Sequence, residues 1–198
     1  MKKNVFCVAM FGMVLAFGLV VLGCNKANAQ SSANKKGFIV EGIKVTDDLN
    51  KEFKVDAEMR GNIAGSGGGD LGIVGNIKDG RLQMTIPIPS AKQLHGSPQA
   101  MYNDSNIEKF GEGMMLGQLY VNASGGVRLE LHPQGGFGDL MEIWYANKDG
   151  DISYYDGGTQ HLKQGWNFIE NSLDAPVSVF STLEEVYDYG HSWELRDW

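Results

Sequence analysis

The sequence predicts an all-β fold, an antiparallel β-sandwich or barrel with one short C-terminal helix, formed by a single domain over residues 37–198. The first observation behind this prediction is an apolar period of two. Residues 53–60 and 81–88 alternate apolar with polar side chains, which places one face of a strand in a core and the other in water. The second is a set of glycine-rich turn signals between short apolar runs. Together they predict antiparallel hairpins.

Further strands are expected wherever a short apolar run lies between turn residues. In chain order these runs are 38–43, 71–77, 115–121, 127–131, 141–146, 152–155, 166–169 and 177–180, and the alternating tail 193–198 is expected to close the sheet. Asp and Gly tolerate the positive φ angles of tight turns. Hairpins are therefore predicted at residues 78–80, 124–126 and 148–150.

Three stretches depart from the strand pattern. Residues 61–70 are predicted to be a mobile loop, and residues 89–113 form the longest irregular segment, with a helical pattern only at 104–110. A long connection in a compact domain is usually functional or disordered. Near the end, Thr182 and Glu185 have the spacing of a capping box, which predicts a short helix that stops before Gly190.

The N-terminal region has the composition of an export signal. Lys2 and Lys3 precede an uncharged apolar run over residues 5–22. The end of that run, Val21-Leu22-Gly23-Cys24, resembles the lipobox of bacterial lipoproteins. The resemblance implies that residues 1–23 are removed and that Cys24 becomes the first residue, with a diacylglyceryl thioether and usually an acylated amino group. Several acyl chains hold a protein at a membrane effectively permanently.

Two other interpretations of the N-terminal region remain open. Ala27-Asn28-Ala29 before Gln30 fits ordinary cleavage, which would release a soluble secreted protein. The apolar run is also nearly long enough to stay in the bilayer as an uncleaved anchor. We favour the lipid anchor at Cys24, followed by a flexible polar tether over 24–36. Asn25 is not the aspartate that retains lipoproteins in the inner membrane of enterobacteria, so the outer membrane is favoured.

Composition excludes several kinds of partner and site. The formal net charge is −7, and removal of Lys2 and Lys3 with the signal makes it −9, so a nucleic-acid partner is not expected. The two cysteines are Cys7, inside the signal, and Cys24. No thiol is left for a disulfide or a zinc site in the domain, and no cofactor is predicted.

The motifs that resemble metal or nucleotide sites are incomplete. Asn147, Asp149 and Asp156 partly match a calcium loop, but Tyr145 occupies the first ligand position, so a hairpin turn is favoured. Residues 65–70 have the glycines of a phosphate-binding loop without its Lys-Ser/Thr pair. Zinc-ligand spacing is absent from the histidines, which are His95, His132, His161 and His191. No Gly-x-Ser-x-Gly nucleophile elbow exists.

An aromatic cluster lies near the C-terminus. It consists of Tyr187, Tyr189, His191, Trp193 and Trp198. Such a cluster can stack a sugar or a peptide, but in a β domain it is more often part of the core, which is the interpretation we favour.

One segment supports the fold and the compartment. Residues 144–150 (Trp-Tyr-Ala-Asn-Lys-Asp-Gly) and 162–167 (Leu-Lys-Gln-Gly-Trp-Asn) resemble segments of all-β surface lipoproteins of spirochaetes and Bacteroidetes. The resemblance implies an all-β domain at the cell envelope and no particular chemistry. A glycine turn followed by a strand-anchoring tryptophan explains Trp166 equally well.

Two functions from different classes follow. We prefer a non-enzymatic surface module that binds a ligand, a host molecule or an envelope protein through loops 61–70 and 89–113. The alternative is a periplasmic or surface hydrolase whose carboxylates, among Glu108, Glu112 and Asp139, converge in space. A purely structural envelope component is a third possibility.

Overall fold

The computed structural model describes residues 37–47, 56–64, 68–100, 107–124, 126–133, 140–170 and 178–196. The predicted signal, lipidation site Cys24 and tether lie outside these residues, as do Asp139 and Trp198. Within them, no helix is long and apolar enough to cross a membrane.

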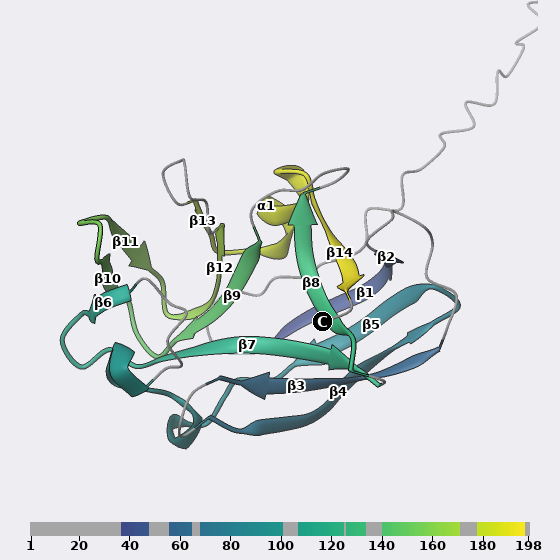
Figure 1. Ribbon diagram of the computed structural model, residues 1–198, viewed down its shortest axis with the longest axis horizontal. Helices are drawn as coiled ribbons and strands as arrows, with labels where there is room; N and C mark the ends of the chain where they lie inside the picture. Colours follow the sequence, from purple (N-terminus) through teal and green to yellow (C-terminus); the bar gives the residue numbers. More distant parts are fainter. Residues whose placement is uncertain are drawn as a thin grey trace, which may run out of the picture.

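Eleven strands of the described residues form one large, mainly antiparallel sheet that curls into a half-barrel (Figure 1). Its order is β1-β5-β4-β3-β7-β8-β9-β12-β13, and β14 pairs antiparallel with β8 and parallel with β2. The bounds are β1 Phe38–Lys44, β2 Thr46–Asp47, β3 Ala57–Ile63, β4 Asp70–Lys78, β5 Arg81–Ile86, β7 Leu116–Ala123, β8 Arg128–Pro133, β9 Met141–Ala146, β12 Gly165–Glu170, β13 Val179–Phe180 and β14 His191–Arg196. The prediction of an antiparallel all-β fold is confirmed.

A second sheet of three strands packs beside the first. It contains β6 (Ile107–Phe110), β10 (Gly150–Tyr154) and β11 (Thr159–Leu162) in the order β11-β10-β6. Along β9, Ile143 and Tyr145 join the core inside the curl, whereas Trp144 and Ala146 join the cluster under the small sheet. Since β9 is covered on both faces, residues 143–146 form a continuous apolar run rather than an alternating one.

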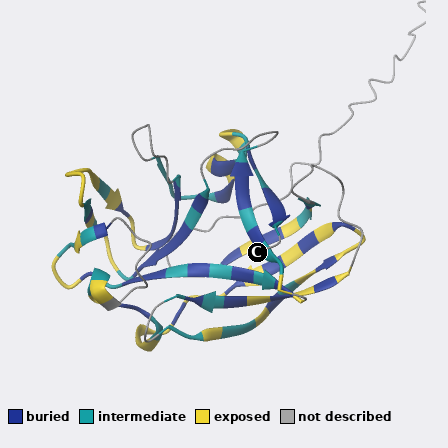
Figure 2. Cartoon of the chain, in the orientation of Figure 1, coloured by how far each residue is buried: buried dark blue, intermediate teal, exposed yellow. Residues whose placement is uncertain are grey.

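The core inside the curl follows the alternation seen in the sequence. Strand β5 buries Leu82, Met84 and Ile86 and exposes the residues between them (Figure 2). Helix α1 (Leu183–Asp188) adds Leu183 and Val186 to this core. Its predicted capping box is present: the Thr182 hydroxyl accepts from the Glu185 amide at 3.2 Å, and the Glu185 carboxylate accepts from the Thr182 amide at 3.1 Å.

The structure confirms one predicted hairpin and overturns another. Residues 78–80 join β4 to β5, with φ of 49° at Asp79 and 71° at Gly80. The prediction that residues 148–150 join β9 to β10 as a hairpin is wrong, because β9 pairs with β12 and β7, while β10 pairs with β11 and β6. The Asp-Gly pair provides a bend there, but it leads the chain from one sheet into the other.

Two further predictions fail locally. The helical pattern at 104–110 is wrong for its described part, since residues 107–110 form β6 and pair with β10. The predicted loop 61–70 is shorter, because β3 runs to Ile63 and β4 starts at Asp70. The irregular segment 89–113 also contains two short 3₁₀ helices, η1 (Ala91–Gln93) and η2 (Pro98–Ala100). Strands β2 and β11 lack a distinct apolar run and had no predicted counterpart.

Candidate functional site

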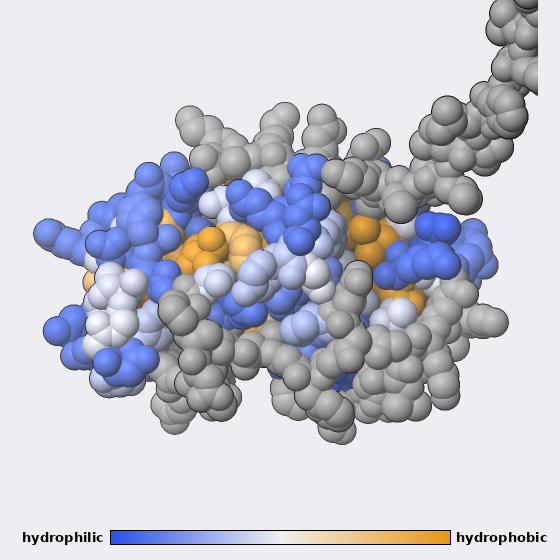
Figure 3. All heavy atoms as spheres, turned by 90° about the horizontal axis from the view of Figure 1, so that it is seen from above, coloured by the Kyte–Doolittle hydropathy of each residue, from blue (hydrophilic) through white to orange (hydrophobic). Residues whose placement is uncertain are grey.

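A groove of about 620 Å³ lies between the edges of the two sheets, where β11 faces β13 and α1. The β11 side contributes His161 and Lys163, and β13 contributes Val179 and Phe180. The view in Figure 3, onto this side of the molecule, shows hydrophobic atoms exposed between hydrophilic ones. The groove is shallow and open, so much of this volume faces solvent. We refer to this feature as the groove.

One aromatic side chain in the groove is both exposed and fixed. Tyr189 follows α1 and is 52% exposed. Its ring stacks on buried His191 at 5.6 Å between centroids, with 11° between the planes, and its centroid lies 4.9 Å from that of Phe180. Its hydroxyl donates to Glu170 Oε2 at 3.1 Å. The ring is therefore held in place at the surface.

The polar side chains of the groove differ in how they are engaged. Glu185 Oε2 accepts from the Ser181 amide at 2.8 Å as part of the helix cap. His161 Nδ1 lies 2.7 Å from Asp151 Oδ1. Among the described residues, the side chains of Lys163 and Asp188 form no hydrogen bond or ion pair. A ligand in the groove could therefore contact the Lys163 ammonium on the β11 side and the Asp188 carboxylate on the helix side without displacing a described residue.

A second group of polar residues is largely buried, and its ion pairs run along the individual strands. The register of β8 against β14 places Arg128, Glu130 and His132 beside Arg196 and Glu194, and we call these five residues the charged cluster. His132 Nε2 lies 2.8 Å from Glu130 Oε2, and Arg128 Nη1 lies 3.6 Å from Glu130 Oε1. Arg196 Nη2 donates to Glu194 Oε2 at 3.1 Å.

The charged cluster holds Glu130 ionised. Burial by itself raises the pKa of Glu130, but the hydrogen bond with His132 and the charges of His132, Arg128 and Arg196 outweigh it, so the pKa lies below its usual value. Arg128 is also held from the other side, with its guanidinium carbon 4.4 Å from the centroid of the Tyr120 ring.

Beside the charged cluster, β8 and β9 diverge and leave a small hollow of about 30 Å³. The carboxylates of Glu130 and Glu142 both line it, together with Gln118 and Tyr120. Glu142 Oε2 accepts from Trp144 Nε1 at 2.9 Å. A space of this size holds about one water molecule.

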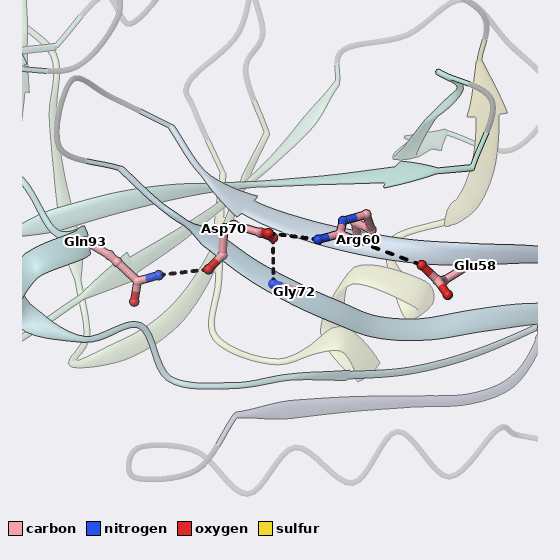
Figure 4. Close-up of polar contacts among 5 residues, drawn as sticks. All are labelled: Glu58, Arg60, Asp70, Gly72 and Gln93. Atoms are coloured by element: carbon pink, nitrogen blue, oxygen red, sulfur yellow. Dashed lines mark hydrogen bonds and ion pairs between the residues drawn. The ribbon is translucent and has the colours of Figure 1, made fainter.

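The structure brings the two predicted binding loops together (Figure 4). Gln93 Nε2 donates to the Asp70 carbonyl at 3.5 Å, and a Cβ on Gly69 would lie 3.1 Å from the same nitrogen. The side chain of Asp70 accepts from the Gly72 amide at 2.7 Å and from Arg60 at 2.8 Å. These two hydrogen bonds, the first more than the second, lower the pKa of Asp70. Arg60 Nη1 also lies 4.0 Å from Glu58. We call residues 62–64, 68–72 and 90–95 the loop face.

One of the carboxylates predicted for a hydrolase has a cationic partner. Glu108, on β6, pairs with Lys109 at 3.5 Å. At Glu112 it is the backbone carbonyl, not the carboxylate, that accepts from Lys148 Nζ. Asp139 lies outside the described residues. The two carboxylates that do share a hollow, Glu130 and Glu142, lie on strands 127–131 and 141–146 of the sequence, where alternation predicts only a strand face.

The side-chain oxygens of the partial calcium motif accept hydrogen bonds from backbone amides. Asn147, Asp149 and Asp156 accept from the amides of Met115, Gln164 and Gly158 at 2.7, 2.7 and 2.8 Å respectively. In the part of the chain that the structure describes, no three His, Cys, Asp or Glu residues lie close enough to hold a metal ion.

The predicted aromatic cluster divides into a buried and an exposed part. Trp193 is wholly buried, and its indole donates to Tyr187 Oη at 2.8 Å. Burial raises the pKa of Tyr187 to about 12, against the opposing effect of that hydrogen bond. The core interpretation is confirmed for Trp193 and wrong for Tyr189, which lines the groove.

Residues 162–167, part of the segment that resembles envelope lipoproteins, form a turn that leads into β12. Buried Asn167 donates to the carbonyls of Lys163 at 2.9 Å and Gly165 at 3.0 Å, and accepts from the Lys163 amide at 3.0 Å. Gly165 has a φ of 110°. The same turn places Lys163 at the groove.

Comparison of the chain with protein-family models, curated proteins and solved structures found no match.

Proposed function

We propose that the chain is a lipid-anchored protein of the bacterial outer membrane whose β domain binds a ligand without catalysing a reaction. The groove is the observation that carries the binding function. It combines a volume of about 620 Å³, an exposed tyrosine held by its neighbours, and polar side chains that have no other partner in the described residues. Such a combination of apolar surface with a few polar groups is the usual composition of a ligand site.

We place the site in the groove rather than on the loop face. The polar groups drawn in Figure 4, on the loop face and on the adjoining part of β3, are engaged with one another, and Gln93 Oε1 also accepts from the Ser90 amide at 2.8 Å. A ligand there would have to displace these hydrogen bonds. In the groove, the side chains of Lys163 and Asp188 have no hydrogen bond or ion pair with any described residue that a ligand would have to displace.

One observation argues against hydrolysis at the carboxylate pair of Glu130 and Glu142. The hollow that Glu130 shares with Glu142 measures about 30 Å³, which leaves no room for a substrate.

The anchoring part of the proposal is supported by Leu22-Gly23-Cys24 at the end of the apolar run, and metabolic labelling tests it. We expect radiolabelled palmitate to enter the full chain produced in a Gram-negative host, and Cys24→Ala to abolish the label. Cys7→Ala is the matched control and should keep it, because that cysteine is removed with the signal. A wild-type product that takes up no label, starts at Gln30 by mass spectrometry and fractionates as soluble contradicts the lipid anchor.

A further inference from the structure

We infer that the groove binds a neutral saccharide, an inference that rests on the proposed binding function and names its ligand class. Three properties of the groove carry it: its charge, the arrangement of its polar and apolar groups, and the distance between the strands that border it.

The charge of the groove disfavours an anionic ligand. Lys163 is the cation of the β11 side, whereas the helix side carries Glu185 and Asp188. His161 is paired with Asp151, which offsets any positive charge on its ring. The whole chain is also acidic, with a formal net charge of −7. Long-range attraction would therefore not bring an acidic ligand to this surface.

The polar groups are complementary to hydroxyls. Lys163 offers hydrogen-bond donors on one side of the groove, and the Asp188 carboxylate offers acceptors on the other. A sugar hydroxyl both donates and accepts, so a ring of hydroxyls can satisfy both sides at once. Between them, Val179, Phe180 and the exposed ring of Tyr189 provide apolar surface for the C–H face of a pyranose.

The spacing of the bordering strands argues against an extended peptide. Cα atoms of β11 and β13 approach within 8 Å of each other. A peptide inserted as a strand between two edges needs about 9.5 Å, twice the spacing of neighbouring strands. Addition of a strand between these edges is therefore excluded where they approach.

Isothermal titration calorimetry of the full chain in detergent micelles tests the inference, with cellotetraose, maltotetraose and N-acetylated chitotetraose as probes. We expect at least one of them to bind. Because the ligand is neutral, its Kd should change less than twofold between low salt and 0.5 M NaCl, whereas binding of a charged ligand weakens with salt.

Variants locate that binding in the groove. Tyr189→Ala should weaken it about tenfold or more, since the aromatic contact surface is lost. Tyr189→Phe keeps the ring and should stay within about threefold, which separates loss of the contact from loss of folding. Lys163→Ala and Asp188→Ala should each weaken binding several-fold. Tyr155→Ala is the matched control, because Tyr155 is 71% exposed on the β10–β11 turn, outside the groove, and its loss should leave Kd unchanged.

The outcomes separate the saccharide from the binding function itself. Tetra-alanine, a zwitterionic peptide, serves as the comparison probe. If it binds in a Tyr189-dependent manner while the saccharides give no heat, the saccharide inference is overturned and the proposed function stands. If neither kind of probe binds, or if Tyr189→Ala binds as the wild type does, both are overturned.

Discussion

The charged cluster and the groove contain the same kinds of side chain in opposite circumstances. In the cluster, Glu194 is 3% exposed and His132 is 6% exposed. Both carboxylates there have an arginine partner, because removing a charge from water is costly unless an opposite charge replaces the lost hydration. In the groove, Lys163 and Asp188 remain in contact with water and need no partner to be tolerated.

This difference separates a structural role from a binding role. The charged cluster resembles a catalytic site in composition, yet its two carboxylates are already paired with basic side chains on their own strands. The groove has fewer internal contacts, so its groups are available to a ligand. The following predictions test whether burial and pairing indeed distinguish the two regions.

The largest effect is expected when the charged cluster loses its central acid. Glu130→Ala leaves His132 and Arg128 without their carboxylate partner in a half-buried position, and we expect the free energy of unfolding to fall by about 3 kcal/mol. Urea denaturation of the full chain measures it. Glu41→Ala is the control, on an exposed position of β1, and should stay within about 0.5 kcal/mol of the wild type. Equal effects of the two substitutions would contradict a structural role for the cluster.

Acid should weaken the same interaction in the wild type. The pKa of Glu130 in the folded state lies below the usual value of 4.5, so its contribution to stability is fully present above that pH and is lost as the pH falls through the folded pKa. The stability difference between the wild type and Glu130→Gln should therefore narrow as the pH falls below about 4.5. A difference that does not narrow below that pH would show that the carboxylate is not stabilised by its basic neighbours.

Local patterns in the sequence were sufficient for most of the fold. The alternation over 81–86 and the turn at Asp79-Gly80 involve residues close in the chain, so their strand and hairpin could be predicted. The partner of β9 could not, because residues 143–146 are apolar on both faces and the same pattern suits several neighbours. Residues 148–150 show the consequence, since a good turn sequence there does not make a hairpin.

The charged cluster and the groove could not be predicted from local sequence patterns, for different reasons. Alternation of Arg128, Glu130 and His132 with buried leucines predicts a polar strand face, but only the pairing with β14 makes that face half-buried. The groove combines β11, β13 and α1, whose adjacency depends on how the two sheets pack. Tyr189 belonged to an aromatic cluster visible in the sequence, yet whether it is buried or exposed depended on that packing.

The smallest effects are expected in the groove, where two acids of one helix can be compared. Asp188→Ala should change the free energy of unfolding by less than about 0.5 kcal/mol, because its side chain is exposed and makes no polar contact in the described residues. Glu185→Ala removes the carboxylate that accepts from the Ser181 and Thr182 amides, and should cost about 1 kcal/mol. Thermal unfolding of the two variants side by side measures the difference. A larger loss of stability for Asp188→Ala than for Glu185→Ala would show that Asp188 stabilises the helix and is therefore not free to bind a ligand.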